Sequence, residues 1–183
     1  MEAPKSITIE AGDNLEAKIS QIKSEGITKL VIGTSFQSMP TMEGLYCTKY
    51  LEILSTQIDS IPEETFSNNQ NIESVILSSS IKTISNRAFF SSSISQINLE
   101  NVNTIETEAF CNCINLQSVN LNSIQFLNNS CFSNTSLIEI NLPTDFRYVP
   151  QYEFYNCISL TSFVSSCAGF GEYSFCNCTS LKV

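Results

Sequence analysis

Six phenylalanines recur along the chain at a nearly constant interval, and this interval constrains the fold more than any other feature of the sequence. Self-similarity at a period of about 22 residues is typical of a solenoid, in which each repeat forms one turn. A single turn cannot bury its apolar face alone, so stacked turns must share a continuous core. The repeated residues are Phe66, Phe89, Phe110, Phe132, Phe154 and Phe175.

The positions around each phenylalanine repeat as well. The end of each repeat, such as SVILS from residue 74 and EINLP from residue 139, alternates apolar and polar residues as a half-buried strand does. We expect these strands to be parallel and about 4.8 Å apart, with one ring per layer reaching the core from the returning, convex segment. Buried apolar positions are predicted eight before each phenylalanine (Ile58, Ile81, Val102, Ile124, Phe146, Cys167), five before (Ile61, Ile84, Ile105, Leu127, Val149, Phe170) and five or six after (Ile72, Ile94, Leu116, Leu137, Leu160, Leu181).

The first 35 residues have a different pattern. SITIE and ITKLVIG are typical of strands, and the segment between them is typical of a short amphipathic helix. The sequence therefore predicts an α+β repeat solenoid with a β-α-β N-terminal cap over residues 1–35. The solenoid covers residues 36–183, as one degenerate unit and about six clear units, the last truncated. The helix signals are a capping box from Asp13 to Glu16, an apolar stripe of Leu15, Ile19 and Ile22, and a stop at Gly26.

The repeat also resembles a known family. The pattern I..I....AF.NC..L..V.L is clearest in VNTIETEAFCNCINLQSVNL at residues 102–121, with echoes in YVPQYEFYNCISLTSF and FGEYSFCNCTSL. It is similar to the BspA-like leucine-rich repeats, also called the TpLRR class, over about residues 36 to 183. The resemblance implies a curved or flattish leucine-rich solenoid used for protein binding, adhesion or recognition, generally without catalysis.

Charge and composition exclude several functions. Eighteen acidic residues against nine basic ones give a net charge of −9, which disfavours nucleic acid and anionic membranes as partners. The chain has no histidine, the commonest general base and metal ligand, so we predict no catalytic residue and a non-enzymatic protein. Because no stretch is apolar enough to span a bilayer and the start has no secretory pattern, a cytoplasmic protein is expected.

The cysteine pairs are the only sequence feature that suggests metal or thiol chemistry. Cys113, Cys157 and Cys178 all stand three residues after a repeat phenylalanine, so they occupy equivalent positions. Cys113 and Cys178 are three turns apart, about 14 Å at 4.8 Å per turn, which excludes one shared zinc site. No metal and no cofactor are predicted, and the cysteines are interpreted as small buried residues. The alternative is a disulfide between Cys157 and Cys178 in an oxidising compartment.

Two surfaces are candidates for binding. The first is a strip of strand residues pointing away from the core, and its alternative interpretation is a solvated ladder without a ligand. The second is a patch rich in tyrosine and arginine, residue types that are common at interface hot spots. The strip consists of Ser74, Ile76, Gln96, Asn98, Ser118, Asn120, Glu139, Asn141, Ser162 and Val164, and the patch of Arg147, Tyr148, Tyr152 and Tyr155.

The leading hypothesis is a scaffold or adaptor that binds another protein through this strip. The predicted C-terminal edge, Phe175, Leu181 and Val183, lacks a polar cap, so we also predict a homo-oligomer joined there. One alternative is an extracellular or surface adhesin of the BspA-like kind. Another, which the absence of histidine disfavours, is a thiol or metal protein that uses the Cys-x-Cys pairs.

Overall fold

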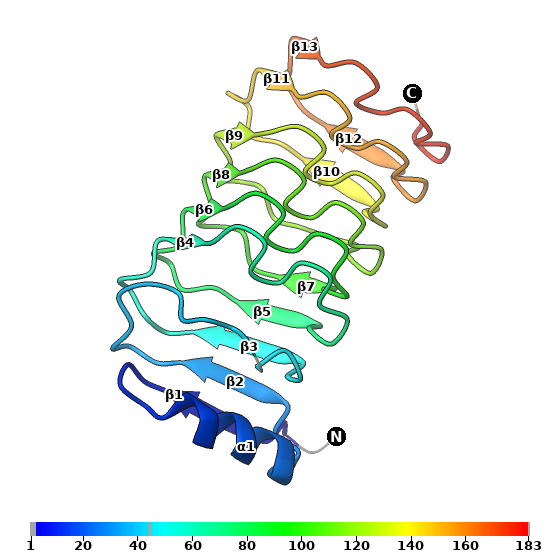
Figure 1. The fold of residues 1–183 in the computed structure, drawn as a ribbon. Coiled ribbons are helices and arrows are strands. Elements are labelled where there is room, and N and C mark those ends of the chain that lie inside the picture. The colour runs from blue at the N-terminus through cyan, green and yellow to red at the C-terminus, as the bar shows by residue number, and fades with distance from the viewer. Residues whose placement is uncertain (1–2, 44, 183) are drawn as a thin grey trace.

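The chain winds into a stack of turns that forms a parallel-strand β-solenoid (Figure 1). This computed structural model describes residues 3–43 and 45–182. Strands from one side of the turns form the main sheet, and strands from a second side form the lateral sheet. The main sheet has the order β1-β2-β3-β5-β7, followed by the separate pair β10-β12, and the lateral sheet has the order β4-β6-β8-β9, followed by the pair β11-β13.

All the strands are short, as expected for a solenoid with turns of about 22 residues. The main-sheet strands are β1 (Ser6–Ile9), β2 (Lys29–Ile32), β3 (Tyr50–Ile53), β5 (Ser74–Ile76), β7 (Gln96–Ile97), β10 (Glu139–Asn141) and β12 (Ser162–Val164). The lateral strands are β4 (Ser60–Ile61), β6 (Thr83–Ile84), β8 (Thr104–Ile105), β9 (Phe126–Leu127), β11 (Tyr148–Val149) and β13 (Gly169–Phe170). The described residues contain one helix, α1 (Leu15–Glu25), so the fold is mostly β rather than evenly α+β.

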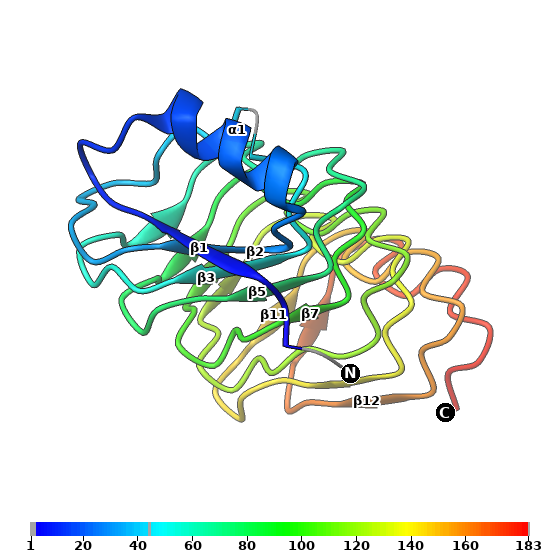
Figure 2. The ribbon, with the colours of Figure 1, turned by 90° about the horizontal axis from the view of Figure 1, so that it is seen from below.

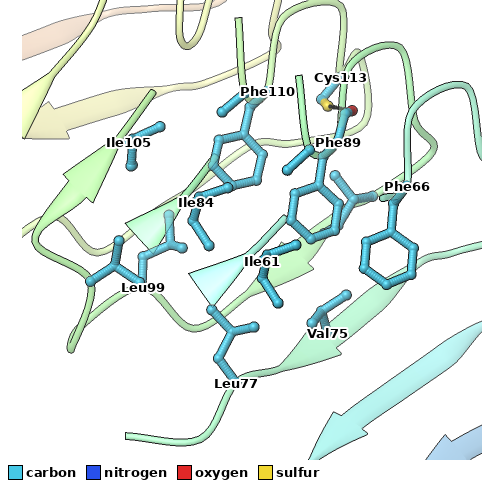
Figure 3. Packing of buried hydrophobic residues seen from close by; sticks show 14 of the residues in the cluster. Ile61, Phe66, Val75, Leu77, Ile84, Phe89, Leu99, Ile105, Phe110 and Cys113 are labelled. Carbon is cyan, nitrogen blue, oxygen red and sulfur yellow. Dashed lines mark hydrogen bonds between the residues drawn. The ribbon is translucent and has the colours of Figure 1, made fainter. Parts of the chain in front are cut away.

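The phenylalanine column fills the core of the solenoid, as predicted (Figure 3). Consecutive ring centroids lie 5.1, 5.2, 5.4, 6.1 and 5.3 Å apart, with interplanar angles between 1° and 24°. The first five rings are buried, and Phe175 is partly buried. Offset stacking adds to the stabilisation that each ring provides through its buried area. Most predicted apolar positions are buried, but Phe170, in the last turn that the structure describes, is 53% exposed.

Backbone hydrogen bonds join the turns on both sides of each ring. In each turn the N–H of the phenylalanine, and those of the residues two before and two after it, donate to carbonyls of the next turn. Phe89 N donates to Ala109 O at 2.8 Å, and Ser91 N donates to Cys111 O at 2.8 Å. The two flanking residues adopt positive φ, as at Glu108 (56°) and Asn112 (62°). This left-handed geometry is uncommon outside glycine, so the bonds between turns must offset its cost.

Helix α1 lies beside β1 at the N-terminal end of the stack (Figure 2). It begins one residue later than predicted. Asn14 is the N-cap, and its Oδ1 accepts a hydrogen bond from Ala17 N at 3.1 Å. The predicted capping box at Asp13 is wrong, because the Asp13 carboxylate accepts from Glu10 N at 2.8 Å and closes the turn after β1. Gly26 ends the helix with φ of 62°, as predicted.

The main sheet runs from β1 through β7 without interruption. It therefore crosses residue 35, where the sequence places the boundary between cap and solenoid. The division into two domains stays a prediction.

A proline explains where the lateral sheet breaks. In four turns the residue four before the phenylalanine donates its N–H to the preceding lateral strand, as Glu106 N does to Ile84 O at 2.9 Å. In the Phe154 turn this position is occupied by Pro150, which has no N–H to donate to Leu127 O. Consequently β9 and β11 are not paired. Pro62 has the equivalent position in β4's turn, and β4 is the first strand of the lateral sheet.

The ring column predicts how the protein responds to loss of one ring. Phe110→Ala should lower the free energy of unfolding by about 3–5 kcal/mol, because the fully buried ring leaves a cavity. Urea denaturation measures the change. Phe126→Ala is the matched control, since its ring is 62% exposed, and it should change stability much less. Equal stability of Phe110→Ala and the unmodified protein would contradict the core assignment.

Candidate functional site

We call the ten strip residues predicted from the sequence the strand face. They lie along the outer side of the main-sheet strands and of the segment between β7 and β10. Ser74 pairs in register with Gln96, and Glu139 pairs with Ser162, so strip residues stand side by side in neighbouring turns. Ile76 is 49% exposed and Val164 57% exposed, and six of the other eight residues are exposed. Ser74 and Asn98 are half-buried.

The strand face is not a continuous sheet. Residues 118–120 were predicted to form a strand, but the structure has none there, so Ser118 and Asn120 lie between the end of β7 and the start of β10. Both remain exposed. Gln117 O still accepts a hydrogen bond from Ile138 N at 3.1 Å, so this segment remains joined to the following turn.

Two asparagines of the strand face already bind protein backbone. The side chain of Asn98 accepts from Leu77 N at 2.6 Å and donates to Leu77 O at 3.1 Å, so its amide takes the place of a strand neighbour beyond β5. Asn120 Oδ1 accepts from Asn122 N at 3.1 Å within its own turn. The predicted row of asparagines is therefore partly structural, and Ser118, Glu139 and Asn141 are better placed to meet a partner.

The strand face extends further toward the N-terminus than the sequence prediction. Tyr50 and Glu52 of β3 pair with Ser74 and Ile76, so they continue its two rows. Glu52 also forms an ion pair with Lys29 of β2 at 2.7 Å. The alternation of Tyr50, Leu51 and Glu52, of which only Leu51 is buried, is the sequence signal that could have extended the face.

The predicted tyrosine patch divides into two groups. Tyr152 stacks on Tyr173 at 5.1 Å and makes an edge contact with Tyr155 at 5.7 Å. Tyr148 belongs elsewhere: its ring lies over Gly169 of β13, where a Cβ atom would come within 2.9 Å of it. Arg147 and Tyr148 instead line a cleft beside the break in the lateral sheet, so the four predicted residues do not form one surface.

The predicted C-terminal edge is aromatic and partly exposed. Phe175 contacts Phe163 at 4.8 Å and Phe170 at 5.8 Å between ring centroids. Leu181 is half-buried against the core. Val183 lies outside the described residues.

The cysteines act as hydrogen-bond donors within the core. The thiols of Cys113, Cys157 and Cys178 donate to the carbonyls of Phe89, Phe132 and Phe154, at 2.9, 3.1 and 3.0 Å. They therefore do more than fill space. All eight cysteines are thiols in the structure, and Cys157 and Cys178 are not joined by a disulfide.

Burial makes these thiols poor nucleophiles. Desolvation raises the pKa of Cys111 to about 11 and that of Cys113 to about 12. Desolvation likewise raises the pKa of Cys157 to about 11. Among the residues that the structure describes, no cluster of three or more histidine, cysteine or acidic side chains could hold a metal. The Cys111 and Cys113 thiols are therefore unlike the low-pKa thiols of reactive cysteines.

Comparison with known proteins identifies the repeat. The profile of the BspA type leucine-rich repeat region matches residues 45–161 and 99–183, in six copies. The chain belongs to this family. Proteins of this family are generally non-enzymatic repeat proteins, and they generally act as protein-interaction modules. No curated protein sequence matches the chain significantly.

Several solved structures are similar to the chain at low sequence identity. The leucine-rich repeat protein TpLRR of T. pallidum is 17% identical with a TM-score of 0.56, over 85% of this chain and 78% of that one. A leucine rich cell surface protein from Faecalibacterium prausnitzii is 16% identical with a TM-score of 0.48, over 77% of this chain and 48% of that one. The pneumococcal vaccine antigen PcpA is 18% identical with a TM-score of 0.47, over 93% and 40% of the two chains.

Within residues 3–43 and 45–182, no helix has the length and apolar character needed to cross a bilayer. The cytoplasmic location expected from the sequence stays a prediction.

The thiol geometry predicts slow alkylation of the buried cysteines. At pH 8 in the native protein, Cys113 and Cys157 should react with iodoacetamide at least tenfold more slowly than after unfolding in urea, because a raised pKa and burial both suppress the thiolate. Peptide mass spectrometry measures each site, and exposed Cys47 provides the internal reference. Native rates equal to those in urea would contradict the buried positions.

Proposed function

We propose that this protein is a non-catalytic scaffold or adaptor that binds a partner protein through the strand face. The observation that supports the proposal is the exposure of mostly polar side chains along consecutive turns, in register where the main-sheet strands pair. Because the turns are rigidly stacked, a partner would meet groups that are already in position, which lowers the entropic cost of binding.

The chemistry of the strand face favours a partner rich in hydrogen-bond donors. Glu139 is exposed on the face, and Glu73 and Glu100 border it. The nearby lysines are already paired, Lys49 with Glu73 at 2.6 Å and Lys29 with Glu52. Together with the net charge of −9, this favours a partner surface with neutral or basic donors. The exposed Ile76 and Val164 would supply apolar contacts at two points along the face.

Substitution of exposed face residues tests the proposal. The tagged, unmodified chain should capture a set of proteins from a lysate of its source. The variants Ile76→Arg and Ser118→Arg should each fail to capture that set. The bulky cations would block the face while leaving the buried columns intact. Thr107→Arg is the matched control, because it is exposed on the convex turn, and it should keep that set. Capture that survives both face variants, or that Thr107→Arg abolishes, would place the interface elsewhere.

We also propose self-association through the edge that contains Phe175 and Leu181. The partly exposed cluster of Phe163, Phe170 and Phe175 supports this, since an uncovered aromatic group gains free energy when a second copy buries it. Exposed backbone donors in the same turn would add hydrogen bonds, as the N–H groups of Tyr173 and Phe175 have no backbone acceptor in the described chain.

Light scattering after size exclusion tests self-association separately from partner binding. The unmodified chain should have at least the mass of a dimer, and Leu181→Glu should be monomeric because a charge is placed in the contact. Phe126→Glu is the control, since it changes an exposed aromatic residue far from this edge, and it should keep the dimer mass. A monomeric unmodified chain would remove the proposal.

A further inference from the structure

One buried acidic residue interrupts an otherwise uniform column of small residues. The residue just before the phenylalanine is alanine in two central turns, Ala88 and Ala109, and small in others, Cys131 and Ser174. Glu153 takes this position in the Phe154 turn and is completely buried. It therefore places a carboxyl group where the other turns pack a methyl, thiol or hydroxyl group.

The Glu153 carboxyl is only half satisfied. Its Oε2 accepts a hydrogen bond from Cys131 N at 3.1 Å. Its Oε1 is buried without any hydrogen-bond partner in the described chain. A buried carboxylate with one free oxygen is costly, so the protonated form is favoured in the folded protein.

Several interactions on the ring and lateral sides of this interface are weaker than their equivalents elsewhere, while β10 and β12 of the main sheet remain paired across it. Phe132 and Phe154 have the largest ring separation, 6.1 Å against 5.1 to 5.4 Å elsewhere. Phe132 N donates to Glu153 O at 3.2 Å, compared with 2.7 to 2.9 Å for the same bond in the other turns. The lateral sheet is also interrupted here, because Pro150 has no N–H to donate to Leu127 O. Three independent features thus coincide at one interface.

We propose that the interface between the Phe132 and Phe154 turns is a joint, which opens when Glu153 loses its proton and releases the turns from about residue 145 onward. In a solenoid each turn contacts only its neighbours, so one interface can open while the rest of the stack remains folded. Opening exposes the Phe132 and Phe154 rings together with Cys131, which is fully buried in the closed form.

Among the described residues, no basic side chain interacts with Glu153. Cys131 faces it from the preceding turn, and Cys157 of its own turn is the other ionisable group that interacts with it. Ser174 holds the equivalent position in the following turn and carries no charge. Burial raises the pKa of Glu153 well above its ordinary value, and hydrogen bonding to Cys131 opposes this only in part.

The sign of the pH dependence follows from that direction. The pKa of Glu153 is higher in the folded than in the unfolded state, so its contribution to stability is complete below the unfolded value. Stability is then lost as pH rises through the folded value. The joint should therefore be closed in acid and open increasingly toward alkaline pH.

Amide hydrogen exchange between pH 5 and pH 9, corrected for the intrinsic rate at each pH, tests the joint. In the unmodified chain, protection of Phe132 and Asn134, which donate across the joint, should fall at least tenfold as pH rises. Protection of Phe89 and Ser91, which donate across a regular interface, should remain constant. In Glu153→Gln, all four amides should keep their protection throughout, because the glutamine amide cannot ionise.

Two comparisons keep the test decisive. Glu172→Gln removes an exposed carboxylate in the adjacent turn and should retain the behaviour of the unmodified chain. If Glu153→Gln does not fold, the titration of the Glu153 carboxyl is followed directly by carbon NMR in the unmodified protein. Constant protection of Phe132 across the pH range, an equal loss at Phe89, or an ordinary carboxyl titration would each overturn the proposal.

Discussion

The backbone hydrogen bonds on either side of each core phenylalanine are the interaction on which the structure depends. They require two left-handed residues per turn, as at Arg87 (53°) and Ser91 (53°), and they set the spacing at which the rings stack. With that spacing fixed, the isoleucines before each ring and the leucines after it fall into columns. The rings alone would permit many arrangements, whereas the combination of rings and directed N–H groups permits only the stacked one.

The sequence predicts the parts of this fold that follow from apolar spacing. The phenylalanine column, the parallel strands and the order of turns all follow from residues such as Phe110 and Ile105. The lateral sheet was not predicted, because its two-residue strands are too short for a period-two pattern to stand out. Its break at Pro150 was visible in principle, since a proline replaces the N–H that pairs Glu106 with Ile84. The left-handed residues two before each phenylalanine, among them Tyr152 (55°), give no compositional signal, whereas those two after it are asparagine in five of six turns, a residue type enriched at positive φ.

The candidate binding face was predictable in outline but not in detail. The alternation of buried and exposed residues determines which side chains point outward, and the structure places them there. It does not determine what those side chains bind: Asn98 is occupied by the backbone of Leu77, a contact that depends on the packing of neighbouring turns. In the same way, Tyr148 and Tyr152 are close in sequence yet separated by the corner at Pro150, and only the three-dimensional path of the chain reveals this.

The cross-turn N–H groups also give the solenoid a direction. Around each phenylalanine the N–H groups donate forward to the next turn, whereas the sheet segments also donate backward, as Glu106 N does to Ile84 O; on the phenylalanine side, Phe175 N in the last described turn therefore has no backbone acceptor among the described residues. Two copies related by a twofold axis would bring donor against donor and could not extend this ladder. On the phenylalanine side a symmetric pair could not use these N–H groups, whereas a ladder continued between copies would be head-to-tail and could grow without closing.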